Sequence, residues 1–162
     1  GGGVFLGERE TIECAEALMA ATGAQIGIGG DKAFYMPIAD RIQLPPQQTF
    51  HDQVNFYRTA LHEMGHWTGH PSRLDRDQKG APRSASYARE EMVAEMCSAF
   101  TCAELGIVPT VRHADYIGAW LDVLREDSRA VFRAASQASK AADYLLAFRA
   151  AATGDDRHDM AA

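Results

Sequence analysis

The chain has 162 residues, of which 46% are hydrophobic and 23% charged, and this length and composition are typical of one globular domain. No apolar run approaches the roughly 20 residues that cross a bilayer, and the amino-terminal residues do not have the pattern of a signal peptide. A formal net charge of −6 argues against nucleic acid as the main partner, because phosphate binding needs a basic surface. Three cysteines without a CxxC pair argue against a disulfide framework and indicate a cytoplasmic protein.

The first part of the chain predicts one helix and a small sheet. A helix is expected over residues 8–22, because apolar residues recur there at helical spacing and Gly23 follows. Three short strands are expected over residues 25–28, 33–36 and 41–44, with turn-forming residues between them. We expect the sheet that they form to be antiparallel or mixed.

An amphipathic helix is expected next. Thr49 and Asp52 are both suitable N-caps, and the helix should end near Thr68 because Gly69 and Pro71 follow. A polar loop comes after it, and we interpret its basic side chains as solvated: Arg73, Arg76, Lys79 and Arg83.

The remainder predicts further helices. One begins near Ser84 or Ser86 and ends at Gly106, with Pro109 just beyond. Two more amphipathic helices are expected, with apolar faces that extend from 116 to 124 and from 131 to 146.

The strongest functional signal is the segment His62-Glu63-Met64-Gly65-His66 within the first amphipathic helix. Residues i and i+4 lie on one helix face, so the two histidines can hold one Zn²⁺ through their imidazole nitrogens. Glu63 is turned from His62 by about 100°, which places its carboxylate beside a water on the metal, from which it can take a proton. Gly65 has no side chain, so backbone or substrate can approach closely there. Two incidental histidines on a solvent-facing helix are the alternative, but the motif lies in a well-formed amphipathic helix with a capped end.

A catalytic zinc site needs a third protein ligand. His70 is the nearest candidate, although the helix break at Gly69 need not keep it on the same face as the other two histidines. The metzincin pattern requires a histidine where Ser72 stands, which argues against that class. An aspartate of the loop, Asp75 or Asp77, is another option.

The acidic pair Glu91 and Glu95 is the alternative that we prefer. The two residues are one helical turn apart and border the core-facing side of the second helix, where carboxylates are unusual unless something neutralises them. We expect Glu91 to be the ligand, with Glu95 and more remotely His70 supporting the ligands. Exposed helix charges, or an exchange of Glu91 and Glu95, are the alternatives. Glu90 beside them is explained by the preference of acidic groups for helix starts.

These segments resemble the metallopeptidase domain of plasmid-borne ArdC-type antirestriction proteins, a domain type that also occurs in polyvalent proteins of phages and plasmids. The likeness is carried by residues 61–74 (LHEMGHWTGHPSRL), 87–96 (YAREEMVAEM) and 113–117 (HADYI). It extends to residues 30–35 (GDKAFY) and 140–145 (KAADYL), and so covers nearly the whole chain.

The resemblance implies a zincin-like α+β fold with a small sheet of about three strands, an HExxH active-site helix, a Glu-ligand helix and C-terminal helices. It implies one Zn²⁺ per chain, held by His62, His66 and Glu91, with Glu63 as general base. It also implies a role in protecting incoming plasmid DNA from host restriction.

We expect residues 1–162 to form a single domain, the C-terminal fragment of a longer protein, with a disordered tail from about residue 154. In the family that the chain resembles, a separate N-terminal domain binds single-stranded DNA. DNA binding is therefore expected only from such a missing domain, and the expected partner of this domain is a protein or peptide substrate. No membrane contact is expected.

The hypothesised reaction is hydrolysis of a peptide that adds to the sheet edge near Arg41 to Leu44. Two alternatives remain: a catalytically silent, metal-stabilised binding module that acts by protein contact, and a closed structural zinc site with His70 as the fourth ligand. The sequence offers four candidate donors for the oxyanion, namely Tyr35, His70, Tyr87 and His113.

Overall fold

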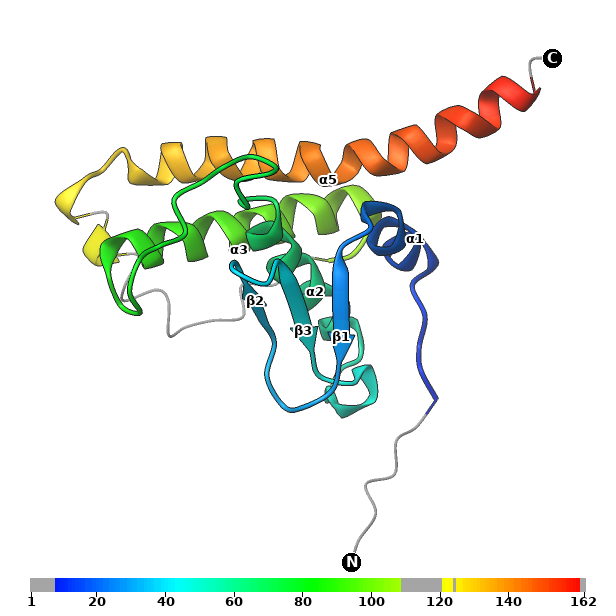
Figure 1. Cartoon of the computed structure of the whole chain (residues 1–162), viewed down its shortest axis with the longest axis horizontal. Coiled ribbons are helices and arrows are strands. Elements are labelled where there is room, and N and C mark those ends of the chain that lie inside the picture. The colour runs from blue at the N-terminus through cyan, green and yellow to red at the C-terminus, as the bar shows by residue number, and fades with distance from the viewer. Residues whose placement is uncertain (1–7, 109–120, 124, 161–162) are drawn as a thin grey trace, which may run out of the picture.

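The computed structural model describes residues 8–108, 121–123 and 125–160, including the side chains up to residue 149. Its helices and strands are shown in Figure 1. In chain order they are α1 (Glu13–Thr22), β1 (Gln25–Ile28), β2 (Phe34–Met36), β3 (Arg41–Leu44), the 3-10 helix η1 (Gln47–Thr49), α2 (Val54–Trp67), α3 (Ala85–Leu105) and α5 (Ala130–Met160). Most of the helix expected over residues 116–124 lies outside the described residues.

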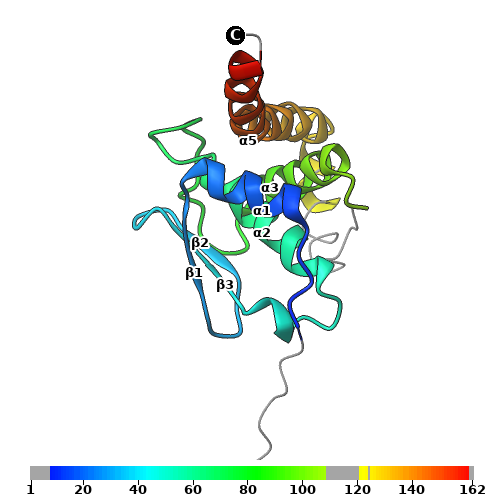
Figure 2. The same cartoon turned by 90° about the vertical axis from the view of Figure 1, so that its right-hand side faces the viewer.

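The elements form layers. The sheet lies against α2, α3 packs beside α2, and α5 covers α3 and α1 on the side away from the sheet (Figure 1). Figure 2 shows the same order from a perpendicular direction, with α5 outermost and the sheet on the opposite side of the helices. The expected α+β architecture, with a small sheet and a majority of helices, is confirmed.

The three strands form a mixed sheet in the order β1-β3-β2, as one of the two expected arrangements. β1 pairs with β3 in parallel, and β2 pairs with β3 in antiparallel orientation. The expectation of a free edge at Arg41 to Leu44 is wrong, because β3 is the central strand. The physical reason lies in its side chains: Ile42 and Leu44 are fully buried, so the strand with the most buried side chains takes the position with neighbours on both sides. β2 is an edge strand, and its residues Phe34 and Tyr35 line the cavity of the site described below.

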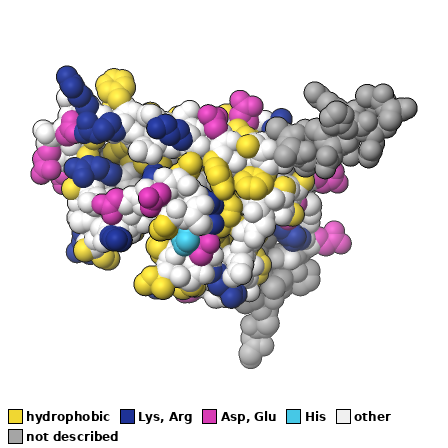
Figure 3. Space-filling view, turned by 45° about the horizontal axis from the view of Figure 1, so that its top comes forward, with side chains coloured by type: hydrophobic (Ala, Val, Ile, Leu, Met, Phe, Trp, Pro, Cys, Tyr) yellow, Lys and Arg dark blue, Asp and Glu magenta, His cyan; other side chains and the backbone are white. Residues whose placement is uncertain are grey.

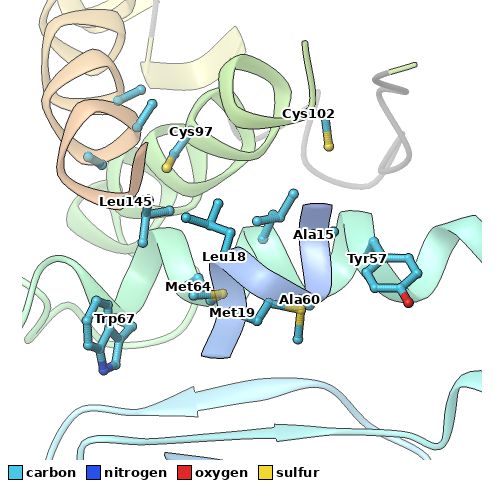
Figure 4. Close-up of a cluster of buried hydrophobic side chains, with 14 of the residues drawn as sticks. Ala15, Leu18, Met19, Tyr57, Ala60, Met64, Trp67, Cys97, Cys102 and Leu145 are labelled. Atoms are coloured by element: carbon cyan, nitrogen blue, oxygen red, sulfur yellow. The ribbon is translucent and has the colours of Figure 1, made fainter. Parts of the chain in front are cut away.

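One hydrophobic core joins the helices. Figure 4 shows Leu18 of α1, Met64 of α2, Cys97 of α3 and Leu145 of α5 converging, and each is almost completely buried. The helix of the histidine motif is therefore anchored from the side away from the sheet by three other helices. Such packing holds the side chains on its remaining face in fixed positions.

The helix boundaries show which local signals matter. α1 begins at Glu13 and not near residue 8, because the preceding segment is extended and bound by glutamines, with Gln53 Nε2 donating to the Glu8 carbonyl over 3.0 Å. α2 begins at Val54, and Asp52, one of the two expected caps, accepts at Oδ1 from the Val54 amide over 3.4 Å. Ser84 caps α3 as expected, its Oγ accepting from the Tyr87 amide over 3.1 Å.

The last helix is longer than expected. α5 continues through Met160, past the point near residue 154 where the sequence analysis expected a disordered tail. A run of alanines from 150 to 152 precedes that point, and alanine favours helix propagation more than any other residue.

Candidate metal centre

Two helices carry the candidate site, and they approach each other closely at Gly65 of α2. A Cβ atom at this position would lie 3.1 Å from Cα and 3.3 Å from the carbonyl oxygen of Ala94 in α3. The absent side chain thus admits backbone, one of the two possibilities that the sequence analysis gave for Gly65. Because the two backbones meet, carboxylates of α3 reach the imidazoles of α2.

His62, His66 and Glu91 form the centre of the site. The two carboxylate oxygens of Glu91 lie 3.1 Å from Nε2 of His62 and 3.0 Å from Nε2 of His66. The nitrogen and oxygen atoms that the three residues offer lie within 4.8 Å of one another, and no side chain among them is more than 12% exposed. Two imidazole nitrogens and one carboxylate oxygen are donors that zinc prefers, so these residues fit one zinc ion with a coordination position left open.

A second carboxylate faces the other ring nitrogen of each histidine. Nδ1 of His62 lies 3.6 Å from Oε2 of Glu95, which therefore stands where the sequence analysis expected a partner for a histidine. Nδ1 of His66 lies 3.9 Å from Oε1 of Glu90. Sequence reasoning misses Glu90, because a glutamate near the start of a helix is already explained by the helix dipole.

The carboxylates set the charges of the histidines. Burial lowers the pKa of His62, but the carboxylates of Glu91 and Glu95 beside its ring raise it to about 9. Burial also lowers the pKa of His66, and the carboxylates of Glu90 and Glu91 beside its ring raise it to about 10. Burial raises the pKa of Glu91, yet its hydrogen bonds to both histidines hold that pKa well below its ordinary value. Without metal, protonated histidines thus face ionised carboxylates, and a metal must displace those protons in order to bind.

Glu63 lies beside this centre without joining it. The residue is 7% exposed, and together with both histidines it lines a cavity of about 270 Å³. Burial raises the pKa of Glu63, and the charges of His66 and His62 oppose that shift. A carboxylate with a raised pKa next to a reaction site is suited to accept a proton and return it.

The candidate oxyanion donors are not equivalent. Tyr35 and Tyr87 line the cavity. The hydroxyl of Tyr35 donates to Oδ1 of Asp40 over 2.7 Å, and burial together with this carboxylate raises the pKa of Tyr35. His70 does not line the cavity, and His113 lies outside the described residues. Among the described candidates, Tyr35 and Tyr87 are therefore the two that lie on the cavity wall.

The remaining candidate ligands lie away from the centre. Nδ1 of His70 is 2.7 Å from Oγ of Ser72, and Asp75 and Asp77 are exposed. Within the part of the chain that the structure describes, His62, His66 and Glu91 are the group of residues that can hold a metal ion together.

The loop between α2 and α3 is more ordered than its composition indicates. The expectation that Arg73 and Arg76 are solvated is wrong, since their side chains are 10% and 6% exposed. Arg73 forms an ion pair with Asp40 and lies over the Trp67 ring, with Cζ 3.8 Å from the ring centroid. Arg76 forms an ion pair of 2.8 Å with Glu90. Each guanidinium is buried because a carboxylate neutralises it.

The described helices include none that is long and apolar enough to cross a membrane.

Comparison with known proteins places this geometry in a family. The chain is 50% identical over 139 residues to a protein named DNA primase TraC from Escherichia coli, and 46% identical over 144 residues to the uncharacterized protein y4eC of Sinorhizobium fredii. These matches cover 85% and 88% of this chain, but only 13% of TraC and 47% of y4eC. The chain thus spans less than half the length of either relative.

The fold also matches a solved structure. The Mn(II)-bound crystal structure of the antirestriction protein ArdC from plasmid R388 aligns with a TM-score of 0.78 and 42% sequence identity, over 86% of this chain and 53% of ArdC. The metal-free ArdC structure aligns with a TM-score of 0.77. The zincin-like metallopeptidase family matches residues 13–137. The resemblance seen in the sequence is confirmed, and the chain belongs to the zincin-like metallopeptidase family.

Proposed function

We propose that this chain is the zinc-dependent metallopeptidase domain of an ArdC-like antirestriction protein, and that it hydrolyses peptide bonds with Glu63 as general base. The observation that carries the proposal is the convergence of His62, His66 and Glu91, with Glu63 in the same cavity but outside the ligand group. A catalytically silent binding module has no use for a buried carboxylate in that place, so we favour the enzyme.

The residues divide the work of hydrolysis. His62, His66 and Glu91 would hold one zinc ion, which supplies a Lewis acid that polarises the scissile carbonyl and acidifies a water molecule. Glu63 takes a proton from the attacking water and passes it to the leaving amine. Tyr35 and Tyr87, both on the cavity wall, are the proposed candidate donors to the oxyanion.

The substrate side of the cavity is formed by β2. This strand pairs with β3 through one edge, and Phe34 and Tyr35 belong to the cavity wall. An extended peptide can add to the other edge of β2, where backbone groups supply binding and side-chain contacts supply specificity. Phe34 and Met36 are 40% and 36% exposed, which suits contacts with apolar substrate residues.

A protein substrate agrees with the surface charge better than DNA does. The net charge is −6, and on the face shown in Figure 3 acidic and basic side chains are interspersed. That face offers no continuous basic surface for phosphates. We therefore assign any DNA contact to other parts of the longer relatives, and we propose that this domain acts in the cytoplasm on a protein involved in restriction.

The test is peptide hydrolysis by the wild type and by Glu63→Gln, with a peptide library as substrate. Glu13→Gln, at an exposed position of α1, is the matched control. Loss of a general base lowers the rate by about 10²–10⁴-fold. We expect this loss in Glu63→Gln at unchanged zinc content, and no loss in Glu13→Gln. Equal hydrolysis by wild type and Glu63→Gln would refute the assigned role of Glu63. A Glu63→Gln variant that retains full antirestriction activity would favour the silent binding module.

A further inference from the structure

A loop side chain bridges the two helices of the metal centre. Arg76 comes from the segment that follows α2, and it donates from Nη2 to the Gly65 carbonyl over 2.7 Å and from Nη1 to Oγ1 of Thr68 over 2.9 Å. Its Nε and Nη2 also donate to Oε1 of Glu90 in α3, over 3.0 and 2.8 Å. One guanidinium therefore satisfies acceptors near the end of α2 and holds a carboxylate of α3.

Gln78 repeats this connection. Its Nε2 donates to the His66 carbonyl over 2.6 Å and to Oε1 of Glu90 over 2.9 Å. Arg76 and Gln78 together direct several donors to Glu90. Glu90 is buried, and the two loop side chains are partly buried. The Glu90 carboxylate is thus fixed by the loop as well as by its own helix.

The backbone just after α2 leaves room for the side chains of Arg76 and Gln78. A Cβ atom at Gly69 would lie 2.6 Å from Nε2 of Gln78 and 2.8 Å from Nη2 of Arg76. Distances this short are incompatible with a side chain at that position unless the donors move. Gly69 accordingly lets the loop side chains pass close to the backbone and reach Glu90.

The bridge ends at a histidine of the metal centre. Glu90 Oε1 lies 3.9 Å from Nδ1 of His66, while Nε2 of the same ring lies 3.0 Å from Glu91. A carboxylate at Nδ1 favours the tautomer that carries its proton there and leaves Nε2 available for a metal. Through Glu90, the contacts of Arg76 thus extend to the surroundings of His66.

We propose that Arg76 is a positioning residue of the metal centre, which holds the Glu90 carboxylate against Nδ1 of His66 and so presents Nε2 to the metal. This inference rests on the proposed metal site but not on peptidase activity. Without Arg76, the buried Glu90 carboxylate loses the guanidinium that holds it in place, and it can move away from His66. Nδ1 of His66 then loses its carboxylate neighbour.

The experiment measures zinc affinity by competition with a chromophoric chelator, together with the visible absorption spectrum of the Co²⁺-substituted protein. The variants are Arg76→Met, Glu90→Gln and the double variant. Arg73→Met is the matched control, because Arg73 is also a buried loop arginine in an ion pair but contacts Asp40 and not Glu90. Removal of such a supporting partner lowers metal affinity by about 10–100-fold.

We expect Arg76→Met and Glu90→Gln each to lower zinc affinity within that range and to alter the Co²⁺ spectrum, and Arg73→Met to do neither. Because Arg76 acts through Glu90, the double variant should bind zinc no more weakly than Glu90→Gln alone. Additive losses, or wild-type affinity and spectrum in Arg76→Met, would overturn the inference.

Two further outcomes are decisive. If Arg76→Met does not fold, as judged by circular dichroism, the isosteric Glu90→Gln carries the test, and wild-type affinity in that variant overturns the inference while the proposed peptidase stands. If the wild type itself binds no zinc, the inference and the proposed function both fail.

Discussion

The two walls of the cavity are built in different ways. On the helix wall, α2 and α3 meet at Gly65, and carboxylates face both ring nitrogens of His62 and of His66. On the sheet wall, β2 has three residues, one strand neighbour and an exposed Phe34. The helix wall is closely packed and places imidazoles opposite carboxylates, whereas the sheet wall offers backbone groups and apolar surface.

This difference separates chemistry from recognition. A metal centre needs donors held in one geometry, which packed helices provide. A strand edge binds extended peptides of varied sequence, because most of the affinity comes from backbone hydrogen bonds. Changes to the helix wall should therefore affect metal binding, and changes to the sheet wall should affect substrate binding or stability.

The largest effect is expected at the contact between the helices. In Gly65→Val, a side chain must enter a space where even Cβ meets Ala94 at 3.1 Å, so α2 and α3 separate and Glu91 moves away from the histidines. We expect zinc affinity to fall by more than the roughly 100-fold seen when a supporting residue is lost, and overpacking to cost about 1–3 kcal/mol of unfolding free energy. Calorimetric titration with zinc measures the first effect and urea unfolding the second. Thr59→Val on the same helix is the control, and equal zinc affinity in both variants would contradict the role of Gly65.

The second prediction concerns pH and the metal-free protein. The pKa values of His62 and His66 are raised to about 9 and about 10, so protonation stabilises the fold, fully below about pH 6.5 and progressively less as the pH rises through those values. The pKa of Glu91 is lowered, so its ionisation stabilises the fold above about pH 4.5, and this contribution is lost as the pH falls further. The metal-free protein should therefore have its highest Tm between about pH 4.5 and 6.5, as far as this site determines it.

Above about pH 6.5, bound zinc should oppose the loss of stability with rising pH, because zinc binds neutral imidazoles. The increase in Tm on adding zinc should grow from pH 6 to pH 8, as followed by differential scanning calorimetry with and without metal. A zinc-induced shift that shrinks over this range would contradict the assigned charges.

A smaller effect on stability is expected from the contact between the loop residue Arg73 and Asp40 beside the sheet. Arg73→Met removes the ion pair to Asp40, a residue that also binds Tyr35. Hydrogen bonds to charged groups contribute about 1.5–3 kcal/mol, so the unfolding free energy should fall by about that amount while zinc affinity stays at the wild-type value. Urea unfolding measures the first quantity. A loss of zinc binding in this variant would show that the two walls are not independent.

The smallest effect is expected on the exposed strand. Phe34→Ala should raise KM for apolar peptides by roughly fivefold or less, since a tenfold change needs about 1.4 kcal/mol and the ring is already partly packed. We expect kcat to remain near the wild-type value. Phe132→Ala on α5, where the ring is 73% exposed, is the control for removing an exposed aromatic side chain. Steady-state kinetics that show a lower kcat and an unchanged KM would contradict the placement of the substrate along β2.

The residues of the helix wall were largely predictable from sequence, because the spacing of residues within one helix decides which side chains share a face. The spacing of His62 and His66 places both on one face, and the spacing of Glu91 and Glu95 does the same on α3. The order of the strands was not predictable, because β3 takes its central position through contacts between distant segments. Sequence periodicity reports which residues share a face and not which strand becomes the neighbour of another.

The link between the loop and the metal centre was also missed. Arg76 and Glu90 each have an ordinary explanation when taken alone, as a solvated loop charge and as a helix-start charge. One sequence feature does indicate close packing in this region. Gly65 and Gly69 are four residues apart, so both lie on one side of the helix end, where the absence of side chains lets other groups come close to the backbone. Which groups approach there depends on how the loop folds back, and the local pattern does not contain that information.

The most direct test of the account is the zinc content of three proteins, measured by mass spectrometry after dialysis: wild type, Glu91→Ala and Glu95→Ala. The account predicts one zinc per chain in the wild type, none in Glu91→Ala, and a retained but more weakly bound ion in Glu95→Ala. Retention in Glu91→Ala with loss in Glu95→Ala would contradict the assignment of the ligand, and the absence of stoichiometric metal from the wild type would contradict the metal centre itself.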